Sequence, residues 1–131
     1  MADDVRERLR SRLEAVAQRP GLEDPQAPWG PARELEQDVA LLRAVLLAAA
    51  ASDGGQASAV SADELGAALS LFEHMRNQVD RLETQVVIEA RRRGMEWKQI
   101  APYQGLGSSQ AATQRYQRLM TRLEEIRQGV R

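Results

Sequence analysis

The stretch GMEWKQIAPYQGLGSSQAATQRYQRL, residues 94–119, decides the fold of the C-terminal part of the chain. Its apolar residues are spaced as on two helices joined by a short turn. Trp97, Ile100 and Ala101 share one face of a short first helix, and residues 105–107 (Gly-Leu-Gly) form the turn. A small residue such as Ala101 lets two helices cross steeply. The residues that face inward from the second helix are Ala111, Ala112, Tyr116 and Leu119.

The second helix has its own start signal and a polar outward face. The hydroxyl of Ser108 can cap the free amides of the first turn. No carboxylate occurs in this helix before Glu124, whereas a solvated helix face usually mixes both signs of charge. Amide, hydroxyl and guanidinium groups bind base edges and phosphates, so this pattern favours DNA recognition. The alternative is a helical hairpin inside an all-α protein. The outward residues are Ser109, Gln110, Thr113, Gln114, Gln117, Arg118 and Thr121.

Charge is distributed unevenly along the chain. The net charge is −1, but residues 1–80 carry 8 Lys and Arg against 14 Asp and Glu, and residues 81–131 carry 10 against 5. This places the basic half on the predicted DNA-reading end. We expect phosphate contacts from Lys98, Arg115, Arg118 and residues 91–93 (Arg-Arg-Arg). These last three arginines could equally stabilise the C-terminal end of the helix that precedes the motif. The predicted DNA-binding residues are Arg91, Arg92, Arg93, Lys98, Ser108, Ser109, Gln110, Thr113, Gln114, Arg115, Gln117 and Arg118.

The run from Ala90 to Leu119 resembles the C-terminal module of small actinobacterial helix-turn-helix regulators. In that family an Ala- and Arg-rich helix leads to a Trp-containing helix and then to a Gln-Ala-Ala-x-x-Arg-aromatic recognition helix. The resemblance extends over about residues 61–122 and implies a transcriptional regulator without enzymatic activity. The matching residues are Gln110, Ala111, Ala112, Gln114, Arg115, Tyr116, Arg118 and Leu119. The departures are Gly107 and Ser109, where basic residues are frequent, and Pro102 and Gln104, where Ala and Leu are common; they imply weaker phosphate binding or another base preference.

A long helix is predicted over residues 61–93. Ser61 and Glu64 form a capping box at its start, and Gly94 ends it. Apolar residues repeat along it with heptad spacing, as in a helix-pairing seam. Other apolar residues, such as Leu71 and Val87, fall outside that stripe, so the helix must bury a second face. The predicted dimerisation residues are Leu65, Phe72, Met75, Val79 and Leu82.

The expected packing partner of this helix is an Ala-rich helix over residues 31–52. A connector over residues 52–60 is long enough to return the chain as an antiparallel hairpin. Such a hairpin predicts a homodimer, because pairing gives a regulator two DNA-reading ends at fixed spacing. The alternative is a monomeric bundle in which the heptad stripe is core.

Two further segments precede the hairpin. Residues 3–18 have the pattern of an amphipathic helix, and residues 19–31 contain four prolines and two glycines, which predicts a linker. Trp29 in this linker either docks on the core of its own chain or binds a partner. The expected organisation is an all-α fold with an N-terminal helical region (1–60), a connecting and dimerisation helix (61–93) and a helix-turn-helix module (94–131).

Composition limits the remaining functions. The chain has 43% hydrophobic residues, no cysteine and one histidine, so we expect a folded protein without disulfides, metal or cofactor. His74 has no second histidine or cysteine nearby and is interpreted as structural, and Glu34, Glu36 and Asp38 as acids at the start of a helix. The absence of a membrane-length apolar run or signal peptide predicts a cytoplasmic, nucleoid-associated protein with no membrane partner. The alternative function is an all-helical module that binds another regulator or RNA polymerase through the hairpin or the Trp29 loop.

Overall fold

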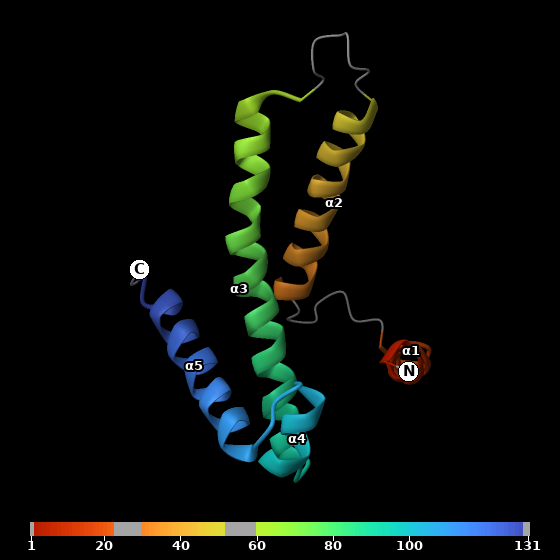
Figure 1. Cartoon of the computed structure of the whole chain (residues 1–131), viewed down its shortest axis with the longest axis vertical. Coiled ribbons are helices and arrows are strands. Elements are labelled where there is room, and N and C mark those ends of the chain that lie inside the picture. The colour runs from red at the N-terminus through yellow and green to blue at the C-terminus, as the bar shows by residue number, and fades with distance from the viewer. Residues whose placement is uncertain (1, 23–29, 52–59, 130–131) are drawn as a thin grey trace.

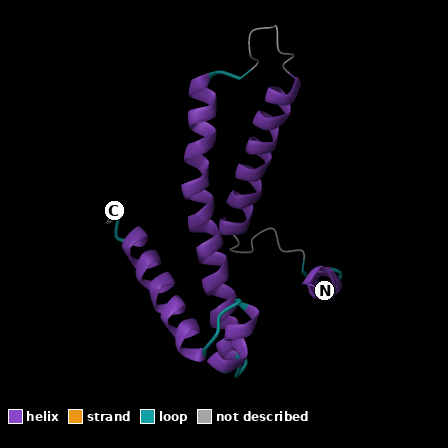
Figure 2. Ribbon diagram, viewed as in Figure 1, coloured by secondary structure: helices purple, strands orange, loops and turns teal. Residues whose placement is uncertain are grey.

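The computed structural model describes residues 2–22, 30–51 and 60–129, and this part of the chain contains five α-helices and no strand (Figures 1 and 2). The predicted all-α fold is therefore confirmed. The helices are α1 (Ala2–Ala17), α2 (Gly30–Ala51), α3 (Ala62–Arg92), α4 (Trp97–Tyr103) and α5 (Ser109–Arg127). None of these helices is long and apolar enough to cross a membrane.

Helices α2 and α3 lie side by side and antiparallel (Figure 1). The predicted capping box starts α3: the amide of Ser61 donates to Glu64 Oε1 (2.8 Å), and the amide of Glu64 donates to Ser61 Oγ (3.1 Å). Pro31 stands in the first turn of α2, where its missing N–H costs no hydrogen bond. The residues that α2 and α3 turn toward each other are Leu35, Asp38, Leu42 and Val45, and Ala68, Leu71, Met75, Gln78 and Leu82.

The centre of this hairpin is polar. Asp38 and Gln78 are 9% and 4% exposed, and His74 Nε2 lies 3.7 Å from Asp38 Oδ2 and 3.5 Å from Glu34 Oε2. Interpreting Glu34, Glu36 and Asp38 as acids of a first helical turn is wrong, because α2 begins at Gly30 and has no acid in its first turn. Asp38 instead belongs to the contact between the two helices.

The predicted dimerisation stripe divides into two faces in the structure. Met75 and Leu82 are half-buried and belong to the side of α3 that packs on α2. Leu65, Phe72 and Val79 remain 40% to 46% exposed. The stripe therefore contributes to the intrachain contact through two of its residues and leaves the other three uncovered.

Helices α4 and α5 pack on each other at the C-terminal end of α3 (Figure 1). Gly94 ends α3 as predicted, with a φ of 87° that side-chain-bearing residues rarely adopt, and Gly105 has a φ of 74° in the turn between α4 and α5. From there α5 runs back beside α3. We call α4, α5 and the C-terminal end of α3 the C-terminal head. Its buried apolar residues are Val87, Ile100, Ala101, Ala112 and Leu119, each at most 6% exposed.

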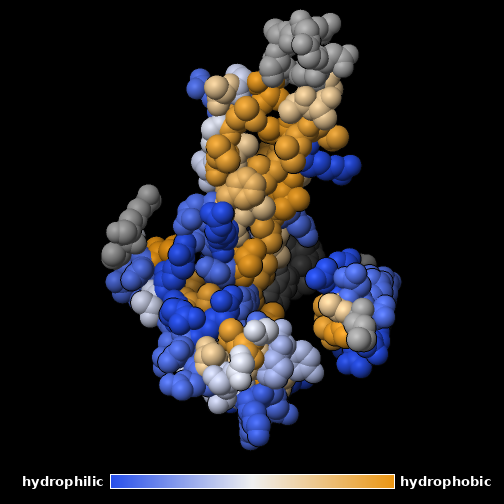
Figure 3. Space-filling model, viewed as in Figure 1, coloured by the Kyte–Doolittle hydropathy of each residue, from blue (hydrophilic) through white to orange (hydrophobic). Residues whose placement is uncertain are grey.

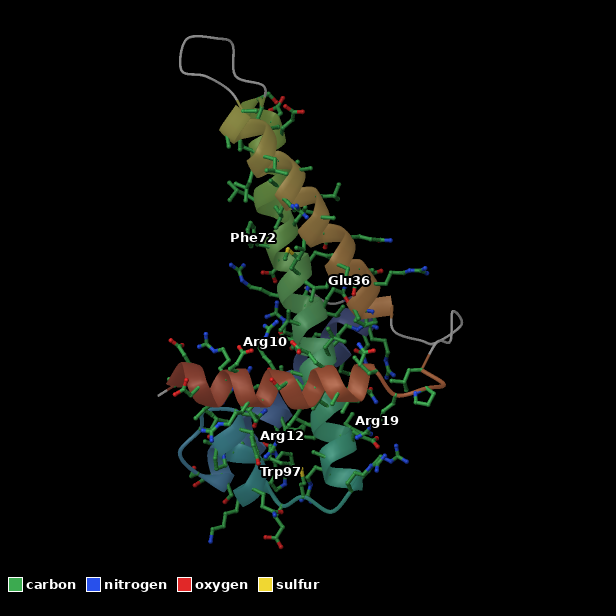
Figure 4. The ribbon with its side chains drawn as sticks, turned by 90° about the vertical axis from the view of Figure 1, so that its right-hand side faces the viewer. Arg10, Arg12, Arg19, Glu36, Phe72 and Trp97 are labelled. Atoms are coloured by element: carbon green, nitrogen blue, oxygen red, sulfur yellow. The ribbon has the colours of Figure 1, made fainter. Side chains whose placement is uncertain are left out.

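Helix α1 confirms the predicted N-terminal helix but buries none of its residues. It stands beside the other helices in Figure 1, and in Figure 4 it crosses in front of them with Arg10 and Arg12 projecting from it. Its apolar residues Val5, Leu9, Leu13 and Val16 are 38% to 68% exposed. Trp29 and connector residues 52–59 lie outside the described residues.

Candidate nucleic-acid interface

The N-terminal end of α5 is held by the predicted cap. Ser108 has extended backbone geometry, and its hydroxyl oxygen accepts a hydrogen bond from the amide of Ala111 at 3.1 Å. Ala112, which is fully buried, and Ala101, which is 2% exposed, allow α4 and α5 to approach closely. The cap and these two alanines together fix the direction in which the first turns of α5 point.

The outward face of α5 is a polar stripe. Gln110, Gln114 and Gln117 are exposed and lie at intervals of four and three residues, so they project from one side of the helix. Thr113 donates its hydroxyl to the carbonyl of Ser109 at 3.0 Å, while Ser109 remains exposed. This face therefore presents three amide side chains, each able to donate and accept hydrogen bonds.

Arg118 adds a positive charge to this stripe. It lines a shallow surface hollow together with Gln114, Gln117, Thr121, Arg122 and Glu125. Arg118 makes no ion pair with any described residue, and the same holds for Lys98 on α4. Both cations are available to an external anion.

Arg115 does not belong to the outward face. Its Nε and Nη2 atoms donate to the two carboxylate oxygens of Glu83 on α3 at 2.5 and 2.6 Å. Gln104, at the end of α4, donates its amide to the same carboxylate at 2.8 Å. The Arg115 hydrogen bonds lower the pKa of Glu83 below its ordinary value, and the carboxylate in turn raises the pKa of Arg115. We therefore remove Arg115 from the predicted phosphate contacts: it joins α5 to α3.

A second ion-pair cluster joins the same two helices farther along. Arg122 donates to Glu73 Oε1 at 2.6 Å and to Asn77 Oδ1 at 2.8 and 3.1 Å, and its Nε lies 3.6 Å from Asp80 Oδ2. Neither the contacts of Glu83 with Arg115 and Gln104 nor this cluster were predicted from the sequence. Their partners are 21 to 49 residues away along the chain, so no local pattern reveals them.

The three consecutive arginines before the motif differ in their surroundings. Arg91 lies over the ring of Trp97 at 4.9 Å and donates to the carbonyl of Met95. Arg92 and Arg93 share Glu89 at 2.8 and 3.0 Å, and their side chains are 73% and 76% exposed. Ion pairs this exposed contribute little to the free energy of folding, so Arg92 and Arg93 can leave Glu89 and bind a phosphate instead. Arg91, in contrast, packs on Trp97 of α4.

An aromatic contact joins α4 to α5 within the head. The rings of Trp97 and Tyr116 lie 5.4 Å apart with a tilt of 46°, a geometry that aromatic pairs favour. Figure 4 shows Trp97 within the head, near the end of the molecule. No group of histidine, aspartate and glutamate side chains in the described ranges 2–22, 30–51 and 60–129 is arranged to hold a metal ion.

Comparison with known proteins adds no family to this geometry: no protein-family model, curated protein or solved structure matches the chain.

We predict that Glu83→Gln weakens the fold at neutral pH and has less effect in acid. Because the pKa of Glu83 is lowered in the folded protein, its stabilisation is present above the ordinary value near 4.5 and is lost as pH falls through the lowered value. Urea unfolding at pH 7 should show a loss of about 1–2 kcal/mol, since the pair is partly exposed. The difference should shrink at pH 3.5. The control is Glu125→Gln, which removes an exposed carboxylate of α5 that belongs to none of the ion pairs described above. Equal pH dependence in both variants would contradict this role of Glu83.

Proposed function

We propose that this protein is a sequence-specific, double-stranded-DNA-binding transcriptional regulator that acts as a homodimer and reads DNA with the N-terminal half of α5. The observation that carries the proposal is that the exposed side of this half of the helix has amide and positively charged side chains and no negatively charged ones. Gln110, Gln114, Gln117 and Arg118 project outward, and no carboxylate occurs among residues 109–123. The two other arginines of that stretch, Arg115 and Arg122, are paired with Glu83 and Glu73 of α3.

The geometry suits a major groove. A groove about 12 Å wide admits one helix, and glutamine amides pair with the edge of adenine through two hydrogen bonds. Helix α5 begins at the lower end of the molecule in Figure 1, next to α4, and runs back beside α3. Gln110 and Gln114, in the first two turns, would meet base edges, as the first residues of recognition helices do.

Positive groups around the stripe would position the helix on the phosphates. Lys98 and Arg118 are unpaired among the described residues, and Arg92 and Arg93 have only the exposed carboxylate of Glu89. Phosphate contacts supply affinity and register, while base contacts supply specificity. This division of roles requires no catalytic group or cofactor. For a regulator of this kind we expect a cytoplasmic, nucleoid-associated location.

A second candidate is an all-helical module that binds another regulator or RNA polymerase. The observation that favours it is the exposed apolar surface of the hairpin, where Val39, Leu46 and Phe72 are 40% to 68% exposed. The two candidates use different ends of the molecule, so a DNA-binding measurement separates them.

The deciding experiment is fluorescence anisotropy of the full chain on labelled genomic duplexes, including the promoter of its own gene, across a salt series. Sequence-specific binding predicts tight association with a subset of duplexes and a steep loss of affinity as salt rises. Uniformly weak or absent binding would contradict DNA recognition and leave the interaction module as the better proposal.

Arg118→Ala should weaken binding to all duplexes by a similar factor and reduce the slope of log affinity against log salt by about 0.9, as expected for one lost phosphate contact. The control is Arg127→Ala, which removes an arginine paired with Glu124 at the opposite end of α5. An unchanged salt slope for Arg118→Ala would exclude this arginine from the phosphate contacts.

A further inference from the structure

An uncovered apolar face runs along the α2–α3 hairpin. On α2, Val39 and Leu46 are 49% and 68% exposed; on α3, Phe72 and Val79 are 40% and 46% exposed. Each follows by one position a residue that points into the hairpin. The apolar face, as we use the term, consists of Val39, Leu46, Leu65, Phe72 and Val79.

Both helices present these residues to the same side. In an antiparallel pair of right-handed helices, residues that follow inward-facing positions lie on one side of the pair, and residues that precede them lie on the other. The approach of His74 Nε2 to Glu34 Oε2 at 3.5 Å identifies the second side, because each of these residues precedes an inward-facing one. Leu41 precedes Leu42 and shares that second side.

The figures agree with this assignment. Figure 3 shows hydrophobic side chains covering α2 and α3 together over the upper part of one face. Phe72 lies toward the left in Figure 4, which is the side that faces the viewer in Figure 3. The apolar face is thus one surface made by two helices.

The apolar side chains that α2 and α3 turn toward each other, such as Leu42 and Leu71, are only half-buried. Asp38 is the one buried residue of α2, and the buried residues of α3 are Gln78, Thr84 and Val87. The whole chain exposes 10710 Å², whereas a compact monomer of 14.6 kDa exposes about 6,900 Å². Obligate homodimers bury about 1,000–2,500 Å² per partner, so this excess is large enough to contain such an interface in addition to the exposed surface of α1.

We infer that a second copy of the chain packs on the apolar face, so that two hairpins form a four-helix bundle. A twofold axis brings identical surfaces together, and this surface meets that requirement because its five members are all apolar. A pair of hairpins closes a core that one hairpin leaves open. Helix α1 is the competing occupant, but a single 16-residue helix covers only part of a surface formed by two longer helices. The inference rests on the proposed function in taking the DNA-binding unit to be a dimer, and it names the surface that forms it.

The first test is sedimentation equilibrium of the full chain without DNA, so its result does not depend on DNA binding. The wild type is expected at twice the chain mass of 14.6 kDa. Phe72→Asp should raise the dimer dissociation constant at least 100-fold, and Leu41→Asp, a charge at an exposed leucine on the opposite side, should leave it within threefold. A monomeric wild type at 100 µM, or a dimer insensitive to Phe72→Asp, would overturn the inference.

The second test remains decisive if Phe72→Asp does not fold. The chain has no cysteine, so Phe72→Cys and Leu41→Cys each carry a single thiol. Maleimide should label the thiol at position 72 at least tenfold more slowly than that at position 41, and dilution into the monomer range should remove the difference. Equal rates at every concentration would overturn the inference. Protection that does not change on dilution would also overturn it, because it would show that α1 of the same chain covers the face.

Discussion

Simultaneous replacement of Gln110 and Gln114 by alanine is expected to lower affinity for the preferred duplex by at least about 30-fold, since each well-placed amide pair contributes roughly 1–3 kcal/mol of base discrimination. Both residues are exposed and lie one helical turn apart on α5, with backbone geometry set by the Ser108 cap. Binding to unrelated duplexes and its salt dependence should persist, because Lys98 and Arg118 remain.

The measurement is competition anisotropy, with the preferred and a scrambled duplex titrated against each protein. Gln128→Ala, which removes an amide just beyond the end of α5, is the matched control and should retain full discrimination. Equal losses on both duplexes would assign the two glutamines to nonspecific contacts, and unchanged discrimination would exclude them from base recognition.

Ile100→Ala is expected to destabilise the C-terminal head by about 2–5 kcal/mol, the range for removing a large aliphatic side chain from a buried site. Ile100 is 4% exposed and belongs to α4, the short helix that packs on α5. The contact of α4 with α5 is small, so the substitution should loosen the head while α2 and α3 remain helical. The affinity for DNA should fall together with the stability of the head.

Urea unfolding followed by Trp97 fluorescence in a Trp29→Phe background measures the head, and far-UV circular dichroism measures the remaining helix. Tyr103→Ala is the control on the same helix, since Tyr103 is 73% exposed and should change stability by less than about 0.5 kcal/mol. A loss below 1 kcal/mol for Ile100→Ala would show that this isoleucine is not a major part of the packing.

Most helix boundaries were predictable because their signals are local. Capping by Ser61 and Ser108 and the glycine that ends α3 involve residues within four positions of one another, and the structure reproduces each. The buried positions Ile100, Ala101, Ala112 and Leu119 also follow from helical spacing.

The sequence could not assign the two sides of α3. Phe72 and Met75 are three residues apart, so they lie only about 60° from each other around the helix, and either could face α2. The partner helix decides that Met75 packs within the chain and Phe72 stays exposed. Likewise, the sequence places Arg115 on a basic recognition helix, but only the fold brings Glu83 to it from 32 residues away.

The carboxylate of Glu83 would have a mechanical consequence in the proposed homodimer. Through Arg115 and Gln104 it links α3 to α5 and to the end of α4, so we expect the C-terminal head to move together with α3. With 31 residues, α3 is a lever about 46 Å long. If two hairpins pivoted against each other by about 5° at the far end, each head would swing by about 4 Å, roughly the rise of one base pair. The angle between the hairpins would thus tune the separation of the two DNA half-sites.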